Sequence, residues 1–301
     1  MNCNPNCNLL AWQTHNVSDD WTGRVDFASL IIREGDRVSA SGRVVRTETG
    51  DWFEPPVPVA ATGSLFRDVR PVWPGSVRIV GADFGDELWG RFERDGAVEG
   101  RATVAGVWTA DCLQVERQDL YAPQHPKFPD WTVPPCPPPP EGWAHQTWVY
   151  DIKDVQTGER PAAAYVGLNY DLGDLQQTGA AVAVTTFRPS EDQAVLVVAA
   201  ADPEAVEAHL RPQLGQLLCV VPSKWTRAEL EAVRAHLHAH HQDWNLYAWG
   251  GYSSTEDGQA KITASLTRIL PEVAAWADSL RAGILDLEPW LTPAPRHTGT
   301  S

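Results

Sequence analysis

The sequence has 301 residues, of which 43% are hydrophobic and 21% are charged, a balance typical of globular proteins. It contains no run of 18 or more apolar residues and no basic, apolar leader among its first thirty residues, so we expect neither a membrane-spanning helix nor a conventional secretory signal. The net charge of −15 disfavours non-specific binding to nucleic acid. We therefore predict a soluble, cytoplasmic protein with no membrane partner.

The first 120 residues carry the alternating apolar pattern of β-strands. Four strands are expected, at residues 37–46, 76–82, 101–108 and 111–117. Residues 83–96 leave room for one short helix. This order resembles that of an OB-type barrel. The resemblance concerns the fold alone and implies a small β-barrel (OB-like) domain over residues 1–120.

A proline-rich segment follows. Nine of the 23 residues from Tyr121 to Trp143 are proline, which lacks an amide N–H and cannot join a helix interior or a central strand. We predict an extended linker over residues 121–143, or a strap that packs on a domain through its tryptophans. A docking ligand for an aromatic groove is the alternative.

In the first strands expected downstream of this segment, the apolar residues no longer alternate with polar ones. Continuous apolar runs at 194–200 and 217–221 are typical of strands buried on both faces. Asp202-Pro203 predicts the start of a helix, and Thr226 with Glu229 forms a capping box that opens a second helix ending near His241.

The last part of the chain completes an α/β pattern. A hairpin is expected from 244–251 and 260–267, then a helix from Pro271 and a strand at 284–291. From Leu217 the order is β-α-β-β-α-β, which is the ferredoxin-like arrangement, preceded by one further βα unit. We therefore predict an α+β protein whose residues 144–301 form a ferredoxin-like α/β domain.

Four histidines crowd the end of the helix opened by Thr226. His236 and His240 stand one turn apart on the same flank, and Asp243 lies just beyond the helix end. Such a pair with a carboxylate can hold zinc or another divalent ion. Histidines near a helix C-terminus also stabilise the helix dipole, and we favour that structural interpretation, with no cofactor.

The five cysteines are Cys3, Cys7, Cys112, Cys136 and Cys219. Their odd number and wide spacing do not indicate a disulfide framework. Cys3 and Cys7 could supply two thiolate ligands, but no second pair accompanies them. Cys219 lies within an apolar run and is expected to be a buried, inert thiol. A reducing compartment is the simpler interpretation.

Fourteen tryptophans are the strongest compositional feature. Trp52, Phe53 and Trp73 lie among glycines and prolines, so we expect them in loops, where aromatic rings can form a stacking surface. Arg37 and Arg43 are expected on the face opposite the apolar residues of their strand. The tryptophans of the second domain, including Trp290, are expected to fill its core.

No P-loop, dinucleotide-binding or nucleophile-elbow motif is present, which leaves catalysis undecided and leans against an enzyme. We predict a non-catalytic binding or regulatory protein that acts through protein–protein contacts at Trp52, Phe53 and Trp73. One alternative is single-stranded nucleic-acid binding by the barrel, with Trp52, Trp73, Arg37 and Arg43 as stacking and phosphate-binding groups. The other alternative is a metal-dependent enzyme that uses the histidine cluster at 236–243.

Overall fold

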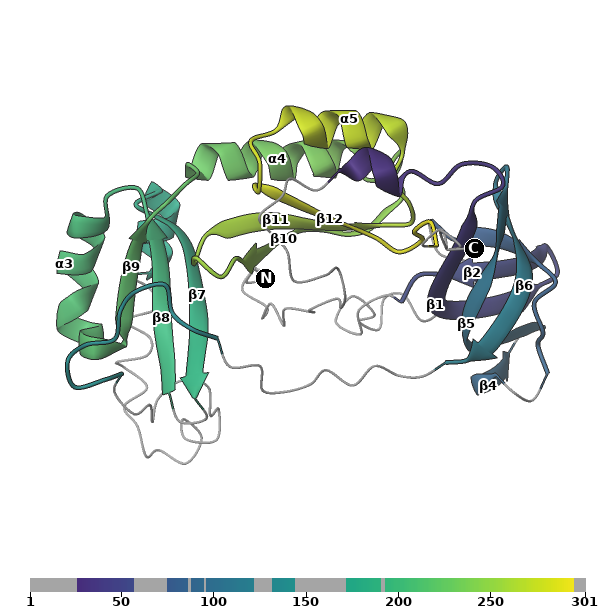
Figure 1. The fold of residues 1–301 in the computed structure, drawn as a ribbon, viewed down its shortest axis with the longest axis horizontal. Helices are drawn as coiled ribbons and strands as arrows, with labels where there is room; N and C mark the ends of the chain where they lie inside the picture. Colours follow the sequence, from purple (N-terminus) through teal and green to yellow (C-terminus); the bar gives the residue numbers. More distant parts are fainter. Residues whose placement is uncertain are drawn as a thin grey trace, which may run out of the picture. The chain divides into compact units, whose positions relative to one another are not determined.

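The computed structural model describes residues 26–56, 75–85, 88–94, 96–121, 132–143, 172–190 and 193–294 (Figure 1). These residues fall into two compact units that interleave along the sequence. The ring unit holds the described residues up to 121, together with 234–251 and 263–294. The sheet unit holds 132–143, 172–190, 193–233 and 252–262. The protein is mixed α+β, and over the described residues it is mostly sheet.

Six strands make up the sheet of the ring unit. They are β1 (Arg37–Thr47), β2 (Gly50–Glu54), β3 (Val77–Val80), β4 (Trp89–Arg94), β5 (Ala97–Thr109) and β6 (Cys112–Leu120). The strand order is β1-β2-β3-β6-β5-β4, and β1 also pairs with β5. Five strands therefore close into a ring, with β4 as an added strand on β5. All of these pairs are antiparallel except β3 with β6.

The strands expected from the alternating pattern are confirmed, whereas the short helix expected within 83–96 is wrong. Residues 89–94 instead form β4, which pairs with β5 from Trp89↔Arg101 to Arg94↔Ala97. Asp95-Gly96 between these strands is a common hairpin sequence, and Gly96 has the positive φ of 77° that such a turn needs. The backbone hydrogen bonds to β5 therefore decide the structure of this segment.

The inside of the ring is an apolar core that alternation along the strands creates. On β1, Val38, Ala40 and Val44 are buried, as the period-two pattern predicts. Val44 and Leu113 are fully buried, and the core cluster of the ring includes Leu291, far along the chain.

A late segment of the chain completes this core. Trp290 packs against Phe53 with ring centroids 4.5 Å apart, and its Nε1 donates a hydrogen bond to the carbonyl of Ser41 at 2.8 Å. The amide of Ala294 donates to the carbonyl of Arg37. The expectation that Trp290 fills the core of a separate C-terminal domain is therefore wrong, because Trp290 packs into the ring.

The sheet unit contains a three-stranded sheet in the order β7-β8-β9. Its elements are β7 (Ala181–Ser190), β8 (Gln193–Ala200), α3 (Pro203–Leu214), η3 (Gly215–Leu217) and β9 (Leu218–Pro222). The predicted cap is confirmed, because the Asp202 side chain accepts a hydrogen bond from the amide of Ala205. Val206, Leu210 and Leu214 of α3 pack on one face of the sheet, and a helix over residues 172–178 adds to that cluster.

The proline-rich segment covers other side chains of the same sheet. Over its described residues, 132–143, it packs as a strap: Cys136 and Trp143 join a cluster with Phe187 and Val197. The backbone amide of Thr132 donates a hydrogen bond to the carbonyl of Arg188. These residues therefore form a strap and not a free linker.

A second three-stranded sheet has the order β10-β11-β12. Its strands and the helices around it are η1 (Phe27–Leu30), α4 (Arg227–His240), β10 (Leu246–Ser254), β11 (Ala260–Leu266), α5 (Pro271–Ser279) and β12 (Leu285–Pro289). The capping box of α4 is confirmed, since Thr226 and Glu229 exchange hydrogen bonds. None of the helices in the described residues is long and apolar enough to cross a membrane.

The β-α-β-β-α-β order of elements from β9 onward is confirmed, but a single ferredoxin-like sheet is not. β9 pairs in parallel with β8, from Leu196↔Leu218 to Ala200↔Pro222, and β10, β11 and β12 form the other sheet. The short strand β9 therefore belongs to the same sheet as β8. The two strands are connected by α3, and β8 and α3 are the βα unit that precedes β9 in the sequence.

Candidate binding surface

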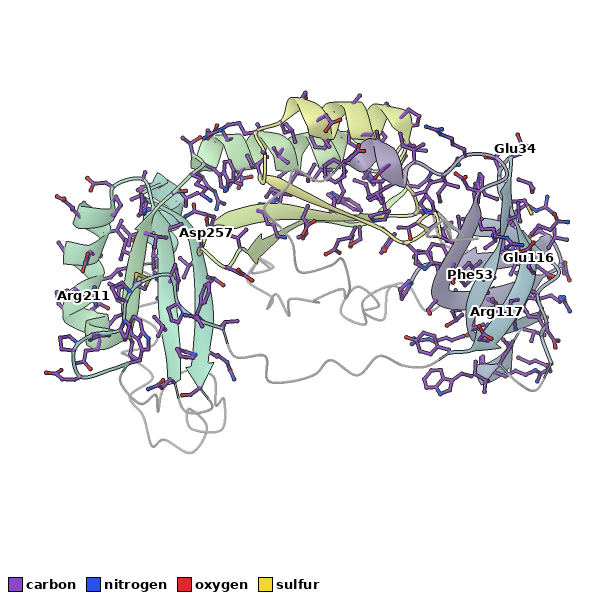
Figure 2. All side chains as sticks on the ribbon, in the orientation of Figure 1. Glu34, Phe53, Glu116, Arg117, Arg211 and Asp257 are labelled. Carbon is purple, nitrogen blue, oxygen red and sulfur yellow. A yellow bond between two sulfur atoms is a disulfide. The ribbon has the colours of Figure 1, made fainter. Side chains whose placement is uncertain are left out.

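The aromatic residues predicted to lie in loops have different positions in the structure. Trp52 and Phe53 lie in strand β2 and not in a loop. Phe53 is fully buried within the ring core (Figure 2 labels it), so its place in a surface contact is a wrong prediction. The alternation of β2 turns Phe53 inward, and Trp52 is half-buried. Trp73 lies outside the described residues.

The two arginines predicted to bind phosphate are both occupied by carboxylates. Arg43 contacts Glu54 and donates from Nη1 to Glu99 at 2.6 Å. Glu54 is only 1% exposed, so Arg43 balances a buried charge. Arg37 bonds Glu116 on β6 at 3.2 Å. A phosphate would have to compete with these partners for either guanidinium group.

Trp52 has a different arginine beside it. In the register of the sheet Trp52 lies opposite Arg78 on β3, and the Arg78 guanidinium carbon stands 5.8 Å from the indole centroid, within cation–π range. Arg78 is exposed. The indole Nε1 of Trp52 is buried and has no hydrogen-bond partner among the described residues, so packing rather than hydrogen bonding holds this ring.

A row of three large side chains crosses neighbouring strands on the outside of the ring. Trp89 on β4 pairs with Arg101 on β5, and Tyr121 follows the end of β6 on the other side of Arg101. The Arg101 guanidinium carbon lies 5.5 Å from the Trp89 ring and 5.6 Å from the Tyr121 ring. The centroids of the Trp89 and Tyr121 rings are 5.6 Å apart. We call Trp89, Arg101 and Tyr121 the aromatic row.

The aromatic row is exposed. Trp89 is 47% exposed, and two further large apolar residues of β4 and β6, Phe92 and Leu120, are 51% and 66% exposed. Among the described residues no carboxylate pairs with Arg101. This surface was not predicted, because Trp89 was expected in a helix and Tyr121 in the proline-rich segment. The Asp95-Gly96 hairpin signal could have placed Trp89 on a strand.

The histidines of α4 stack on tryptophans instead of gathering around a metal site. His236 stacks on Trp276 with centroids 4.5 Å apart, and His240 stacks on Trp244 at 4.9 Å. His240 Nδ1 is 3.9 Å from the Asp243 carboxylate. In the described part of the chain, no three His, Cys, Asp or Glu side chains form a metal-binding group. The predicted trio of His236, His240 and Asp243 is therefore not assembled as a site.

Burial in this stack has an electrostatic consequence. Desolvation lowers the pKa of His236, and the neighbouring His240 lowers it further through charge repulsion. The ring of His236 is therefore kept neutral to lower pH than an ordinary histidine, which suits a ring packed between Trp244 and Trp276.

One pair of cysteines is bonded, although no disulfide was predicted. Cys136 of the strap and Cys219 of β9 form a disulfide, with Cα atoms 5.8 Å apart. Cys219 is buried, as expected, but it is not a free thiol. Cys112 is free and half-buried, and burial raises the pKa of its thiol. Cys3 and Cys7 lie outside the described residues.

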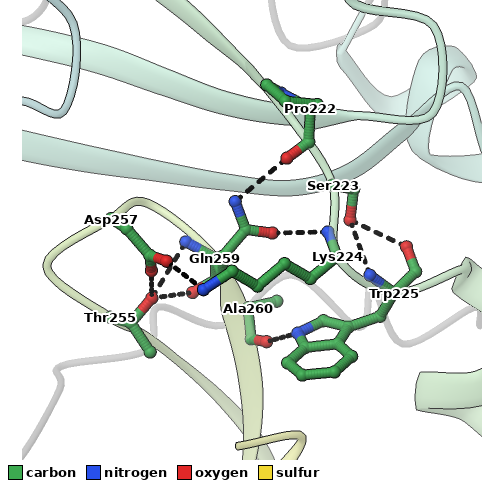
Figure 3. Close-up of polar contacts among 8 residues, drawn as sticks. All are labelled: Pro222, Ser223, Lys224, Trp225, Thr255, Asp257, Gln259 and Ala260. Carbon is green, nitrogen blue, oxygen red and sulfur yellow. Dashed lines mark hydrogen bonds and ion pairs between the residues drawn. The ribbon is translucent and has the colours of Figure 1, made fainter. Parts of the chain in front are cut away.

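A polar network in the sheet unit holds the turn between β10 and β11 against the end of β9 (Figure 3). Gln259, 4% exposed, accepts from the amide of Lys224 at 2.8 Å and donates to the carbonyl of Pro222 at 3.1 Å. Lys224 also contacts Asp257, which bonds Thr255. Every group in this network has a protein partner, so it is structural in character.

We also compared the chain with known proteins. No protein-family model, curated protein or solved structure matched it.

Proposed function

We propose that this chain is a non-catalytic binding protein whose five-strand ring is an OB-type barrel and whose principal partner is another protein. The strand order supports the barrel assignment: β1 closes on β5, and β3 runs parallel to β6. A five-strand ring with mostly antiparallel neighbours and one parallel closure is typical of OB-type barrels. Such barrels often present a ligand-binding surface.

The aromatic row carries the proposal of a protein partner. Trp, Tyr and Arg are the residue types that contribute most to protein–protein binding energy, and here one of each lies in contact on an exposed strand surface. Phe92, which lies opposite Glu99 and so on the same face of the sheet as Arg101, adds exposed apolar area. Exposed apolar side chains that cluster in this way are typical of interaction sites.

The test is a native pull-down from the cells that make the protein, with the captured protein and nucleic acid both identified. We compare the wild type with Trp89→Ala and Arg101→Ala. The matched control is Arg117→Ala, because Arg117 is also an exposed arginine of the ring (labelled in Figure 2) but pairs with Asp119 and lies outside the aromatic row.

We expect a stoichiometric protein that binds the wild type and Arg117→Ala, with at least about tenfold weaker binding to Trp89→Ala and Arg101→Ala, since interface hot spots cost 2 kcal/mol or more on truncation. Equal capture by all four proteins would contradict the assignment of the surface. Capture of nucleic acid alone would contradict the class of partner.

A second candidate function, single-stranded nucleic-acid binding, is favoured by the Trp52–Arg78 pair. An aromatic ring beside an exposed arginine can stack a base and contact its phosphate, and strands 2 and 3 of OB-type barrels are a common nucleic-acid surface. The pairing of Arg37 and Arg43 with carboxylates, together with the net charge of −15, weighs against it.

A titration of a fluorescent oligothymidine tests this candidate. If it holds, affinity falls steeply with salt, and Trp52→Ala weakens binding while Trp89→Ala does not. Absence of binding at low ionic strength removes the candidate.

The cytoplasmic location expected from the sequence also stays a proposal. Disulfides persist in oxidising compartments, and in the cytosol they are usually transient and redox-sensing. A cytoplasmic location therefore requires that the Cys136–Cys219 disulfide of the strap be one that is reduced and reoxidised there.

A further inference from the structure

The strap, residues 132–143, has hydrogen bonds at its two ends and few between them. At one end the amide of Thr132 donates to the carbonyl of Arg188, and the amide of Arg188 donates to Oγ1 of Thr132. At the other end Nε2 of Gln193 donates to the carbonyl of Trp143 at 2.9 Å, and the side chains of Gln216 and Glu141 meet. Six of the twelve strap residues are proline, which cannot donate a backbone hydrogen bond.

The disulfide is the attachment in the middle of the strap. Cys136 lies between Pro135 and Pro137 and bonds Cys219 at the second position of β9. Beneath it are the side chains of Phe187, Val195 and Val197. A covalent bond therefore holds the part of the strap, residues 134–140, in which Cys136 alone keeps a backbone N–H.

The two cysteine residues differ in exposure. Cys136 is half-buried, whereas Cys219 is 1% exposed. Because thiol–disulfide exchange requires a thiolate to reach a sulfur atom, the more exposed residue, Cys136, is the one that we expect an incoming reductant to attack.

From these observations we propose that the Cys136–Cys219 disulfide is a redox latch, which holds the strap over the β7-β8-β9 sheet when oxidised and releases the middle of the strap when reduced. The proposal is independent of the binding surface on the ring unit. Its reductant is a dithiol, as a small molecule or as a protein with a paired-cysteine active site.

The chemical step is a two-electron exchange. A thiolate of the dithiol attacks Sγ of Cys136, the bond to Sγ of Cys219 breaks, and a mixed disulfide forms at Cys136. Cys219 leaves as a thiolate and takes a proton from water. The second thiol of the reductant then attacks the mixed disulfide, which frees Cys136 and leaves the reductant oxidised to its disulfide.

Release of the strap uncovers an apolar face. Phe187, Val195 and Val197 are each 5% exposed or less in the oxidised protein, and α3 covers the opposite face through Val206, Leu210 and other residues. The sheet therefore keeps one packed layer when the strap leaves, so local opening does not require the whole unit to unfold.

The experiment is hydrogen exchange of the full chain followed by mass spectrometry, in the oxidised state and after dithiothreitol. Alkylation of Cys136 and Cys219 monitors reduction. Cys112→Ser is the background for every sample, so that the free thiol of Cys112 takes no part. Cys136→Ser in the same background provides a strap without a latch.

We expect reduction and Cys136→Ser each to speed exchange at the amides of positions 136, 141 and 142 by about tenfold or more, with α3 and β8 protected as before, as for local opening. Reoxidation should restore the slow rate. Three results would overturn the latch: a native disulfide that dithiothreitol does not reduce, unchanged exchange in the reduced strap, or loss of protection across the whole sheet unit.

Discussion

The ring unit and the sheet unit each rely on a segment that is distant in sequence, but they hold that segment by different means. In the ring unit, residues 290–294 pack against the core and donate hydrogen bonds from Trp290 and Ala294 to carbonyls of β1. In the sheet unit, the strap carries a disulfide from Cys136 to Cys219. The segment with available N–H groups is held without a covalent bond, and the segment rich in proline has one.

This difference follows from backbone chemistry. Each residue other than proline can contribute one backbone donor, so a short ordinary segment can be fixed by pairing with an edge or an end of a sheet. A proline-rich segment retains only side-chain packing and carbonyl acceptors. Where such a segment must stay in one place, a covalent bond supplies what the missing donors would have contributed.

The largest effect should come from removing the covalent attachment. The double substitution Cys136→Ser/Cys219→Ser opens a loop with a sequence separation of 83 residues, which lowers the free energy of unfolding by about 4.5 kcal/mol on loop entropy alone. Urea unfolding of both proteins without reductant measures this difference. Equal midpoints would mean that packing and not the disulfide holds the strap.

The second largest effect should come from removing Trp290, which packs on the core of the ring without a covalent bond. Trp290→Ala removes the contact with Phe53 and the hydrogen bond to Ser41, and should destabilise the ring unit by about 3 kcal/mol. Trp290→Phe is the control, because it keeps a ring beside Phe53 but loses the hydrogen bond, and should cost about 1 kcal/mol. If both variants unfold at the wild-type urea concentration, the segment does not stabilise the ring.

A smaller effect should arise from the charge pair in the wall of the ring. Arg43→Met takes the guanidinium group away from Glu54, which is 1% exposed, and should cost about 2 kcal/mol after allowance for the partial exposure of Arg43. The double variant Arg43→Met/Glu54→Gln should recover much of the loss, because no buried charge is then left. A double variant no more stable than Arg43→Met would count against this account.

In the sheet unit the matching polar contact is neutral. The indole Nε1 of Trp225 donates to the carbonyl of Ala260 at 2.6 Å (Figure 3), and Trp225 is 7% exposed. Trp225→Phe should cost about 1 to 2 kcal/mol, since it leaves a carbonyl without this donor. Thermal unfolding monitored by circular dichroism measures this loss of stability. A loss larger than that caused by Arg43→Met would contradict the expectation that the charged contact of the ring unit contributes more than the neutral contact of the sheet unit.

The smallest effect concerns pH and the ring unit. Burial and His240 lower the pKa of His236 below its ordinary value, so the unfolded chain binds a proton more readily than the folded one. Stability is then fully present above about pH 6.5 and is lost as the pH falls through that value toward the lower pKa of the folded state.

Melting temperatures at about pH 5 and about pH 7.5, on either side of the usual histidine pKa, check this effect. His236→Gln should show a smaller decrease on acidification than the wild type, and His209→Gln, on α3 of the sheet unit, serves as the control. An unchanged decrease in His236→Gln would assign the pH dependence to other groups.

Much of the secondary structure was predictable because it depends on local signals. The cap at Asp202 and the capping box at Thr226 and Glu229 fix helix starts through contacts within three residues. The alternation in β1 determines which side chains face the ring core. These features require no knowledge of the rest of the chain.

The errors lie where distant contacts decide. Nothing near Trp290 indicates that it packs against Phe53, and sequence spacing could not pair Cys136 with Cys219 among five cysteines. Arg43 has the pattern of an exposed cation, yet its charge is matched by Glu54 and Glu99 on other strands. The aromatic row escaped prediction for the same reason, because it assembles only when β4 pairs with β5.

The late position of Trp290 also orders the events of biosynthesis. At about 5 to 20 residues per second, the ribosome finishes β6 roughly 10 to 30 seconds before it adds Trp290. During that interval the nascent ring strands lack the indole that packs on Phe53 and the donor that bonds Ser41. The ring strands are therefore made well before the residue that completes their packing, and until Trp290 is added their core lacks this cover.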